Sequence, residues 1–411
     1  MERIVITGMG TINSLAHNVK ETWDKVSSGV SGVGPITLFD ASDWNVKIAS
    51  EVKNFDPTLY MDFKEARRRD RFEQLAVAAV KETIQSSGLE INDDTTHGIG
   101  VIVSTGIGGL GSVQENIYTL KDQGFRRVSP FAIPMMMPNG AAGMISIDHG
   151  IRGPSFSVSS ACASGIDGIG IAWMMLRSGM IDVAIAGGSE ATIVPVGVGA
   201  FDRATAITRS SDWTTNPKPF DRNRDGLVMG EGAALLVLET ESHAKARGAS
   251  ILAELAGWSS NNDGYHITAP REDGSGGGRA ILKALEIAQV NLDEVDYINA
   301  HGTATVLNDA AETTAVKYAF GEEAYQIPLS STKSMTGHMM GATGALEAIF
   351  LVKAINEGIL PPTIHYETPD PVCDLDYIPN KAREKKIKTA ISNSFGFGGH
   401  NAVLVVRKYT G

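Results

Sequence analysis

The sequence predicts an α/β layered fold made of two similar halves. Short runs rich in valine and isoleucine alternate with longer segments of helical period, which is typical of sheets covered by helices. Segments of the first half also resemble segments of the second in their order of strand, glycine turn and helix. The polar residues best suited to chemistry follow directly after apolar runs, at the sheet edge where ligands of α/β proteins bind.

The strands follow one another through both halves in the same way. In the first half we expect them at residues 4–8, 100–106, 155–160, 183–188 and 233–239. In the second half we expect them at residues 297–302, 327–332, 389–396 and 401–408. The charged segment ETESHAKARG separates the two sets, so the sequence predicts one half at residues 1–250 and another at 251–411.

Three pairs of segments indicate the duplication. GVIVSTGIGGLGSVQENIYTL is similar in pattern to DYINAHGTATVLNDAAETTAV, and VMGEGAALLVLE to FGFGGHNAVLVVRK. SFSVSSACASGIDGIGIAWMMLRSG is likewise similar to IPLSSTKSMTGHMMGATGALEAIFLVKAINEG. The likeness lies in pattern more than in identity, as expected for an old duplication.

Composition excludes several classes of function. The formal charge of −11 gives no overall attraction to nucleic acid or to an anionic membrane. Two cysteines cannot form a disulfide framework, and the chain opens on a strand-like run, so we expect a reducing, cytoplasmic setting. The longest uncharged run, residues 128–147, contains three prolines and predicts no membrane span. The 45 glycines, about 11% of the chain against a usual ~7%, are the anomaly to explain.

The segment GIGGLG at residues 106–111 matches the GxGxxG pattern of dinucleotide-binding turns. An acidic ribose ligand should follow about 20 residues later at the end of a strand. The chain there reads DQGFRRVSPFAIP, which has no strand pattern. We therefore interpret this segment as a tight turn with close backbone packing, with nicotinamide binding as the less favoured alternative.

Cys162 is the best candidate nucleophile. It follows SFSVSS and precedes a helix of small residues from 163 to about 177, so its sulfur should lie at a helix N-terminus. There the free N–H groups and the helix dipole stabilise a thiolate, and we expect a lowered thiol pKa. An inert buried cysteine is the alternative, and we prefer that interpretation for Cys373 in the polar stretch PDPVCDLD.

Two histidines share the placement of Cys162 after a predicted strand. His301 lies in NAHGTATVLND and His338 in KSMTGHMMGATG, each among small residues that leave room for a substrate. Either one alone would be interpreted as structural, but a thiol with two imidazoles is a constellation for acyl transfer. Lys333, five residues before His338, would favour neutral imidazoles by its charge.

The glycine-rich segment NSFGFGGHN at residues 393–401 is the last candidate element. Gly396, Gly398 and Gly399 can adopt positive φ and bring backbone amides close to a ligand. Phe397 between them could act as a gate to an apolar cavity. A plain hairpin turn is the alternative.

Together these segments resemble the β-ketoacyl-[acyl-carrier-protein] synthases of the elongating type. The resemblance rests on VSSACASG, PFDRNRDGLVMGEGA, HGTATVLND, KSMTGHMMGATG and NSFGFGGHN, and it spans essentially the whole chain. It implies a thiolase-like fold in which two βαβαβαββ halves form five layers, α-β-α-β-α. It also implies decarboxylative condensation of malonyl-acyl-carrier-protein with a Cys-bound acyl chain, no cofactor or metal, an acyl carrier protein as partner, and a homodimer.

The resemblance further implies a role for each site residue. Cys162 would be the acylated nucleophile, and His301 and His338 would act on the malonyl group. Lys333 would support His338, with Glu347 beside it, and the N–H groups of Cys162 and Phe397 would form the oxyanion hole. The remaining residues that the resemblance places at the site are Ile107, Phe201, Gly398 and Gly399 at the acyl pocket, and Asp309 behind it.

His338 also distinguishes this chain within the superfamily, because initiating synthases resemble a Cys-His-Asn set and thiolases a Cys-His-Cys set. His400 is a departure, since many relatives carry Thr after FGFGG. A polyketide-type ketosynthase and a catalytically silent partner subunit of the same fold stay open as alternatives. Cys162 speaks against the silent subunit.

An acidic carrier protein requires a basic surface on an otherwise acidic chain. Residues 64–71 hold five basic and two acidic side chains, so 5 − 2 gives a local charge of +3. Solvated helix charges are the alternative interpretation. The predicted patch consists of Lys64, Arg67, Arg68, Arg69, Arg126, Arg127, Arg203 and Arg271.

Overall fold

The computed structural model describes residues 2–411 and confirms the predicted fold class. The strands of the first half are β1 (Ile4–Asn13), β4 (Ile99–Ser104), β5 (Ser155–Phe156), β6 (Val183–Glu190) and β7 (Gly232–Thr240). Those of the second half are β8 (Ala253–Asn262), β9 (Tyr297–Asn299), β10 (Leu329–Ser330), β13 (Thr389–Gly396) and β14 (His400–Arg407). Two small antiparallel sheets pair β2 (Gly34–Pro35) with β3 (Ile48–Ala49) and β11 (Ile359–Leu360) with β12 (Arg383–Glu384).

The strand order repeats between the halves. In the first half it is β5-β4-β6-β7-β1, and in the second half it is β10-β9-β13-β14-β8. Parallel and antiparallel pairings also fall at the same places in both. The two sets join where β1 pairs antiparallel with β8, from Ile4 opposite Leu255 to Ile6 opposite Ala253. The predicted boundary near residue 250 lies just before β8 and stays a prediction.

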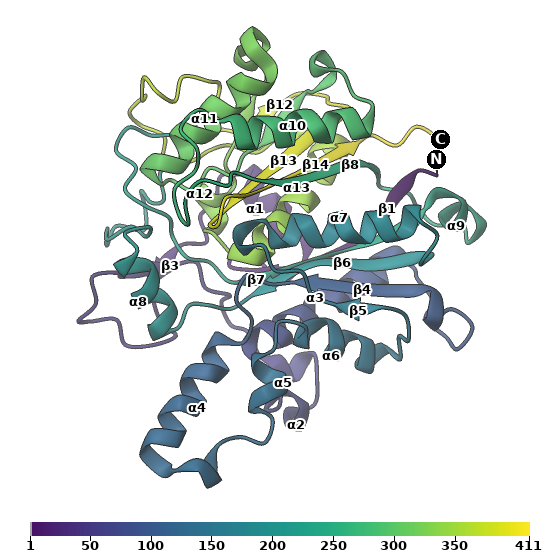
Figure 1. Ribbon diagram of the computed structural model, residues 1–411, viewed down its shortest axis with the longest axis vertical. Coiled ribbons are helices and arrows are strands. Elements are labelled where there is room, and N and C mark those ends of the chain that lie inside the picture. The colour runs from purple at the N-terminus through teal and green to yellow at the C-terminus, as the bar shows by residue number, and fades with distance from the viewer. Residues whose placement is uncertain (1) are drawn as a thin grey trace.

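Helices cover both sets of strands and fill the space between them (Figure 1). Those of the first half are α1 (Val19–Ser27), α2 (Phe63–Ala66), α3 (Arg71–Ser87), α4 (Leu110–Gln123), α5 (Ala132–Met136), α6 (Gly140–His149), α7 (Ser164–Arg177), α8 (Pro195–Arg203) and α9 (Glu241–Ala246). Those of the second half are α10 (Ser275–Ala288), α11 (Val306–Phe320), α12 (Lys333–Thr336) and α13 (Thr343–Glu357). The pair α3 and α6 forms one outer layer, α10 and α11 form the other, and α7 and α13 lie in the middle.

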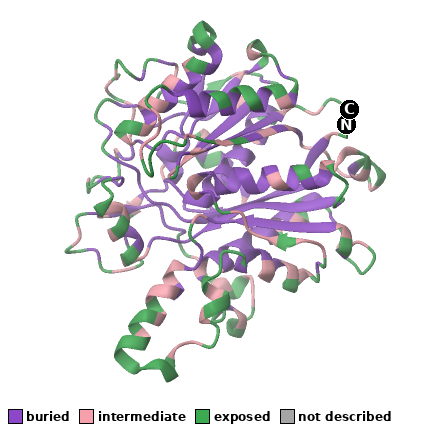
Figure 2. Cartoon of the chain, viewed as in Figure 1, coloured by how far each residue is buried: buried purple, intermediate pink, exposed green. Residues whose placement is uncertain are grey.

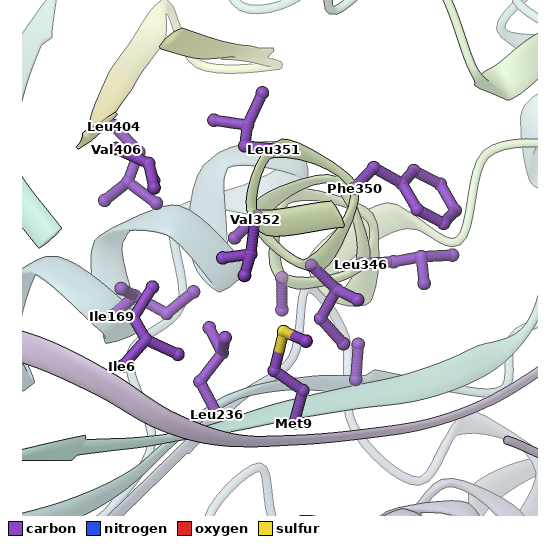
Figure 3. Close-up of a cluster of buried hydrophobic side chains, with 14 of the residues drawn as sticks. Ile6, Met9, Ile169, Leu236, Leu346, Phe350, Leu351, Val352, Leu404 and Val406 are labelled. Atoms are coloured by element: carbon purple, nitrogen blue, oxygen red, sulfur yellow. The ribbon is translucent and has the colours of Figure 1, made fainter. Parts of the chain in front are cut away.

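The middle layer carries most of the apolar core, and its helices are mainly buried (Figure 2). Around α13, Leu346 and Val352 lie among Met9 and Leu236 of the first half and Leu404 of the second (Figure 3). Because these helices are apolar on nearly every face, they are stable only between two sheets. The described residues include no helix long and apolar enough to cross a membrane.

Several predicted strands are shorter or longer than expected. Only Ser155–Phe156 forms a strand in the predicted segment 155–160, and only Tyr297–Asn299 in 297–302. In both segments the chain leaves the sheet toward the interior, because the next residues supply the site described below. Conversely, β1 continues to Asn13 because its whole length is buried between helices and strands.

Candidate active site

Cys162 lies in a 3-10 turn, Ala161–Ala163, that leads directly into α7. Ala161 has a positive φ of 51°, a conformation that costs energy for a residue with a side chain. Ser164 stabilises the turn, because its Oγ donates to the Ala161 carbonyl at 2.6 Å and accepts from the Ser160 N–H at 2.9 Å. The nucleophile is therefore held in a fixed turn at the N-terminus of a central helix.

The expected lowering of the Cys162 pKa is wrong. Burial raises the pKa of this thiol to about 11, although Lys333 and the N–H groups of Phe397 and Cys162 itself oppose that effect. The sequence indicated the helix N-terminus but not how far the site is removed from water. In the resting protein the thiol is thus neutral at pH 7, and its proton must move when the sulfur attacks.

The structure brings His301 and His338 to Cys162. His301 follows β9 and His338 follows α12, so both come from the second half while Cys162 comes from the first. The two rings are 5.3 Å apart between centroids and nearly perpendicular. The Cys162 sulfur and one nitrogen of each ring all lie within 4.8 Å of one another.

Both imidazoles are neutral at pH 7. Burial lowers their pKa values well below 6.5, and the positive charge of Lys333 lowers them further. His338 Nδ1 lies 3.0 Å from Thr343 Oγ1, while its Nε2 is buried without a hydrogen-bond partner among the described residues. His301 Nδ1 is likewise buried without a hydrogen-bond partner among the described residues. These nitrogens are available to a bound molecule.

Lys333 and Glu347 form a buried ion pair behind the histidines. Lys333 Nζ donates to Glu347 Oε1 at 2.6 Å, and each side chain is 1% exposed. Burial raises the pKa of Glu347 to about 7, even with the lysine beside it. The charge of Lys333 acts on the pKa of Cys162, His301 and His338 alike, so this one side chain influences the whole site.

Sequence reasoning missed Glu312, a buried carboxylate on α11. Its two oxygens accept the N–H groups of His301 and Gly302, both at 2.7 Å, and Asn393 Nδ2 donates to it at 3.2 Å. Burial raises its pKa to about 7. Glu312 thereby fixes the backbone that carries His301. Only its place one helical turn beyond HGTATVLND could have indicated it.

Asp309, which the sequence placed behind the site, is fully buried at the start of α11. Its Oδ2 accepts the N–H of Phe220 at 2.7 Å, and Asn308 donates to its Oδ1 at 3.1 Å. Burial raises the pKa of Asp309, and the charge of Arg224 and the N–H of Ala304, in the loop after His301, oppose that effect. Asp309 joins this loop to the segment around Phe220.

The glycine-rich segment forms the turn between β13 and β14 and lies against Cys162. Gly398 and Gly399 have positive φ, as expected, but Gly396 does not. A Cβ atom at Gly396 would lie 3.0 Å from the Ser160 carbonyl and 3.1 Å from the Cys162 nitrogen. Gly396 is thus required for a close backbone approach rather than for an unusual φ.

A cavity of about 330 Å³ reaches from the surface to the three side chains. Phe397 and Phe201 stack across it, with ring centroids 6.3 Å apart. Ile107 and Gly398, which the sequence placed at the acyl pocket, do not line this cavity, whereas Gly399 does. The lining also includes Cys162, His301, His338, Thr268, Thr303, Thr305 and Asn401.

The turn at residues 106–111 has a structural explanation. The buried carboxylate of Glu190, at the end of β6, accepts the Gly106 N–H at 2.6 Å and the Ile107 N–H at 3.3 Å. A Cβ atom at Gly109 would lie 1.9 Å from the Met135 carbonyl. Backbone amides that a dinucleotide phosphate would need are therefore already occupied by a carboxylate, as the interpretation of a tight turn requires.

The predicted basic patch is smaller than expected. Arg69 is 3% exposed and forms two hydrogen bonds of 2.6 Å with Asp148, so its charge is not offered to a partner. Arg271 pairs with Asp273 at 2.9 Å. The sequence counted charges but did not show which were buried or paired. Arg68 stays exposed although it pairs with Glu65 at 3.1 Å. The other side chains of the patch that stay exposed are Lys64, Arg67, Arg126, Arg127 and Arg203.

His400 begins β14 directly after the glycine turn, opposite Gly396 of β13. A Cβ atom at Gly398 would lie 3.1 Å from the His400 ring, so the residue that departs from the family pattern packs against the glycine turn.

The comparisons with known proteins agree with this geometry. The family model described as the β-ketoacyl synthase N-terminal domain matches residues 1–244, and the C-terminal domain model matches residues 252–367. The 3-oxoacyl-[acyl-carrier-protein] synthase 2 of Staphylococcus aureus (strain N315) is 46% identical over 408 residues, 99% of each chain. The protein of that name from Synechocystis sp. (strain ATCC 27184 / PCC 6803 / Kazusa) is 46% identical over 409 residues, 99% of this chain and 98% of its own.

A solved structure is similar over the same length. It is the ketosynthase of a type II polyketide synthase in complex with its acyl-carrier protein and bound to the hexaketide. It matches with a TM-score of 0.92 and 33% identity, covering 99% of this chain and 100% of that one. Fold, site geometry and full-length similarity lead to one conclusion: the chain belongs to the β-ketoacyl synthase family.

Proposed function

We propose that this protein catalyses the elongating condensation of fatty acid synthesis, joining malonyl-acyl-carrier-protein to an acyl chain held on Cys162. The observation that carries the proposal is a helix N-terminal thiol facing two neutral, buried imidazoles at the inner end of one cavity. The two imidazoles supply N–H donors without a change of their own protonation state at pH 7, while the thiol becomes a nucleophile by giving up its proton as it attacks.

The first half-reaction transfers the acyl group. The sulfur of Cys162 forms a bond to the thioester carbon as the carrier thiol leaves, and the thiol proton passes by way of a neutral imidazole to that leaving sulfur. The N–H groups of Cys162 and Phe397 both lower the thiol pKa, and we propose that the same two groups stabilise the oxyanion. The small residues around Cys162 leave room for the tetrahedral intermediate.

The second half-reaction forms the carbon–carbon bond. The malonyl group loses carbon dioxide, and its electron pair moves into an enolate whose oxygen accepts N–H groups from His301 and His338. The enolate carbon then attacks the acyl carbon, and the Cys162 sulfur leaves as a thiolate that takes up one proton from solvent. Lys333 supports this step because its charge keeps both imidazoles neutral.

A loaded acyl carrier protein and a second copy of the chain are the proposed partners. The exposed basic side chains on α2 and beside α4 suit an acidic carrier protein. Exposed apolar side chains on α4, α5 and the turn between them, including Ile117, Phe125 and Ile133, suit a protein interface, and this region protrudes from the molecule (Figure 2). The need for a reduced Cys162 thiol supports a cytoplasmic location.

A polyketide-type ketosynthase is the second candidate, favoured by the likeness to a type II polyketide ketosynthase. The test is to incubate the protein with acyl carrier proteins loaded with acyl chains of several lengths, and then with malonyl carrier. Intact-mass spectrometry should show an acyl adduct on the wild type and none on Cys162→Ala, followed by one two-carbon extension. Repeated extension without reduction would favour polyketide synthesis, and no adduct on folded wild type would refute both.

A further inference from the structure

Glu190 is a buried carboxylate that the mechanism above does not use. It ends β6, is wholly buried, and forms no ion pair with a basic side chain among the residues that the structure describes. Four donors surround it instead: the N–H groups of Gly106 at 2.6 Å, Gly341 at 3.0 Å and Ile107 at 3.3 Å, and the hydroxyl of Thr105 at 2.8 Å. Such a set of donors suits a carboxylate and not an amide.

The donors come from both halves of the chain. Thr105, Gly106 and Ile107 form the turn after β4 in the first half. Gly341 lies in the 3-10 turn Met340–Ala342, which connects His338 to α13 in the second half. Glu190 is thus the polar contact between a turn next to the acyl side of the site and a turn next to a proposed malonyl-side histidine.

These turns are packed too tightly for side chains. A Cβ atom at Gly341 would lie 2.3 Å from the Gly106 nitrogen, and one at Gly188 would lie 2.5 Å from the Gly341 carbonyl oxygen. A Cβ atom at Gly165, on α7 three residues after Cys162, would lie 2.7 Å from the same oxygen. A small change in the position of one turn is therefore transmitted to the others.

Glu190 also acts on the nucleophile by its charge. Its carboxylate raises the pKa of the Cys162 thiol, opposite in direction to Lys333. The two buried groups that act on the Cys162 pKa in opposite directions therefore come from different halves of the chain. A residue that only filled space would have no such influence.

We propose that Glu190 is a positioning residue that holds the Thr105–Ile107 turn and the Met340–Ala342 turn in a fixed position relative to each other beside Cys162. The acyl chain and the malonyl group can then meet in the geometry of attack. The inference rests on the proposed condensation. It predicts that loss of the carboxylate harms the second half-reaction, where both turns must be aligned, more than it harms the reactivity of the thiol.

The test compares Glu190→Gln with the wild type and with Glu73→Gln, which removes another buried carboxylate away from the site. Alkylation of Cys162 by iodoacetamide at pH 7.5 should become about fivefold faster in Glu190→Gln, because a nearby negative charge is lost. Condensation of preformed acyl-Cys162 with malonyl carrier should become about tenfold slower or worse. Glu73→Gln should change neither rate.

Opposite changes in the two rates separate positioning from a loss of stability, which would slow condensation without activating the thiol. The alkylation rate does not depend on condensation, so a failed function and a failed inference remain distinguishable. Wild-type rates in Glu190→Gln, or equal effects in Glu73→Gln, would overturn the inference. If Glu190→Gln does not fold, Thr105→Val should slow condensation and Thr105→Ser should restore it, and an unimpaired Thr105→Val would overturn it.

Discussion

At the scale of single residues, the site depends on charges buried near a neutral thiol. Lys333 lowers the pKa of Cys162, while burial raises it to about 11. Below that pKa the thiolate fraction rises about tenfold per pH unit, so alkylation of Cys162 should accelerate steadily from pH 7 to 10. A plateau near pH 7 would indicate instead that the helix N-terminus dominates.

Lys333→Met tests the influence of the Lys333 charge on the Cys162 thiol. Loss of the positive charge raises the pKa of Cys162, because its anion loses a favourable interaction, and alkylation at pH 8 should become about tenfold slower. Glu347 then lacks its partner and takes up a proton, which limits the cost of burying it. Iodoacetamide kinetics read by peptide mass spectrometry provide the measurement, and an unchanged rate would contradict the assigned influence of Lys333.

His338→Ala gives a second prediction that separates the two half-reactions. The imidazole is proposed to donate to the enolate oxygen, so condensation should fall about 10²–10³-fold. Acylation of Cys162 should persist, because the N–H groups of Cys162 and Phe397 are untouched. Single-turnover assays of each half-reaction check this outcome. Equal losses in both steps would show that His338 acts earlier than proposed.

At the scale of elements, the turn between β13 and β14 is positioned by close contacts of Gly396. Gly396→Ala places a methyl group 3.0 Å from the Ser160 carbonyl and should push the turn away from Cys162. We expect at least a tenfold slower acylation in a folded protein. Gly143→Ala is the matched control, since nothing lies within 4 Å of that Cβ atom in α6.

The sequence predicted some of these elements more accurately than others. Residues 233–239 lie within β7 as expected, because the buried run AALLVL is readable as apolar. The segment 155–160 forms only two strand residues, because its remainder turns inward to present Cys162, and apolar character alone cannot distinguish a strand from a buried turn. Glu190 and Glu312 were missed because their significance comes from N–H groups distant in sequence.

At the scale of the whole molecule, the two halves each supply part of the site. Cys162 and Phe201 come from the first half, and both histidines, Lys333 and Phe397 come from the second. The duplication was readable from the sequence because strand order and turns repeat. That residues of both halves form one site was inferred only from the resemblance, since no local sequence pattern specifies which sheet edges face each other. Some of the glycines lie where backbones of the two halves approach closely, as Gly341 does beside Gly106.

The exposed basic side chains are a property of the surface of the whole molecule. Arg67→Glu with Arg68→Glu reverses two exposed charges just after α2, and should raise the KM for acyl carrier protein about tenfold at low salt. The kcat should change little, because neither residue lies near the cavity. Lys283→Glu on α10, in the outer layer of the second half, is the control (Figure 1). Equal effects of both variants would exclude a specific patch.

In the proposed reaction, the Cys162-bound acyl group is the electrophile of a carbon–carbon bond-forming step. The most direct measurement is a single turnover in which isolated acyl-Cys162 protein meets malonyl carrier protein. We predict loss of the adduct mass together with one equivalent each of carbon dioxide and β-ketoacyl carrier. An adduct that persists, or that is released as free acid while the malonyl carrier stays intact, would contradict the account.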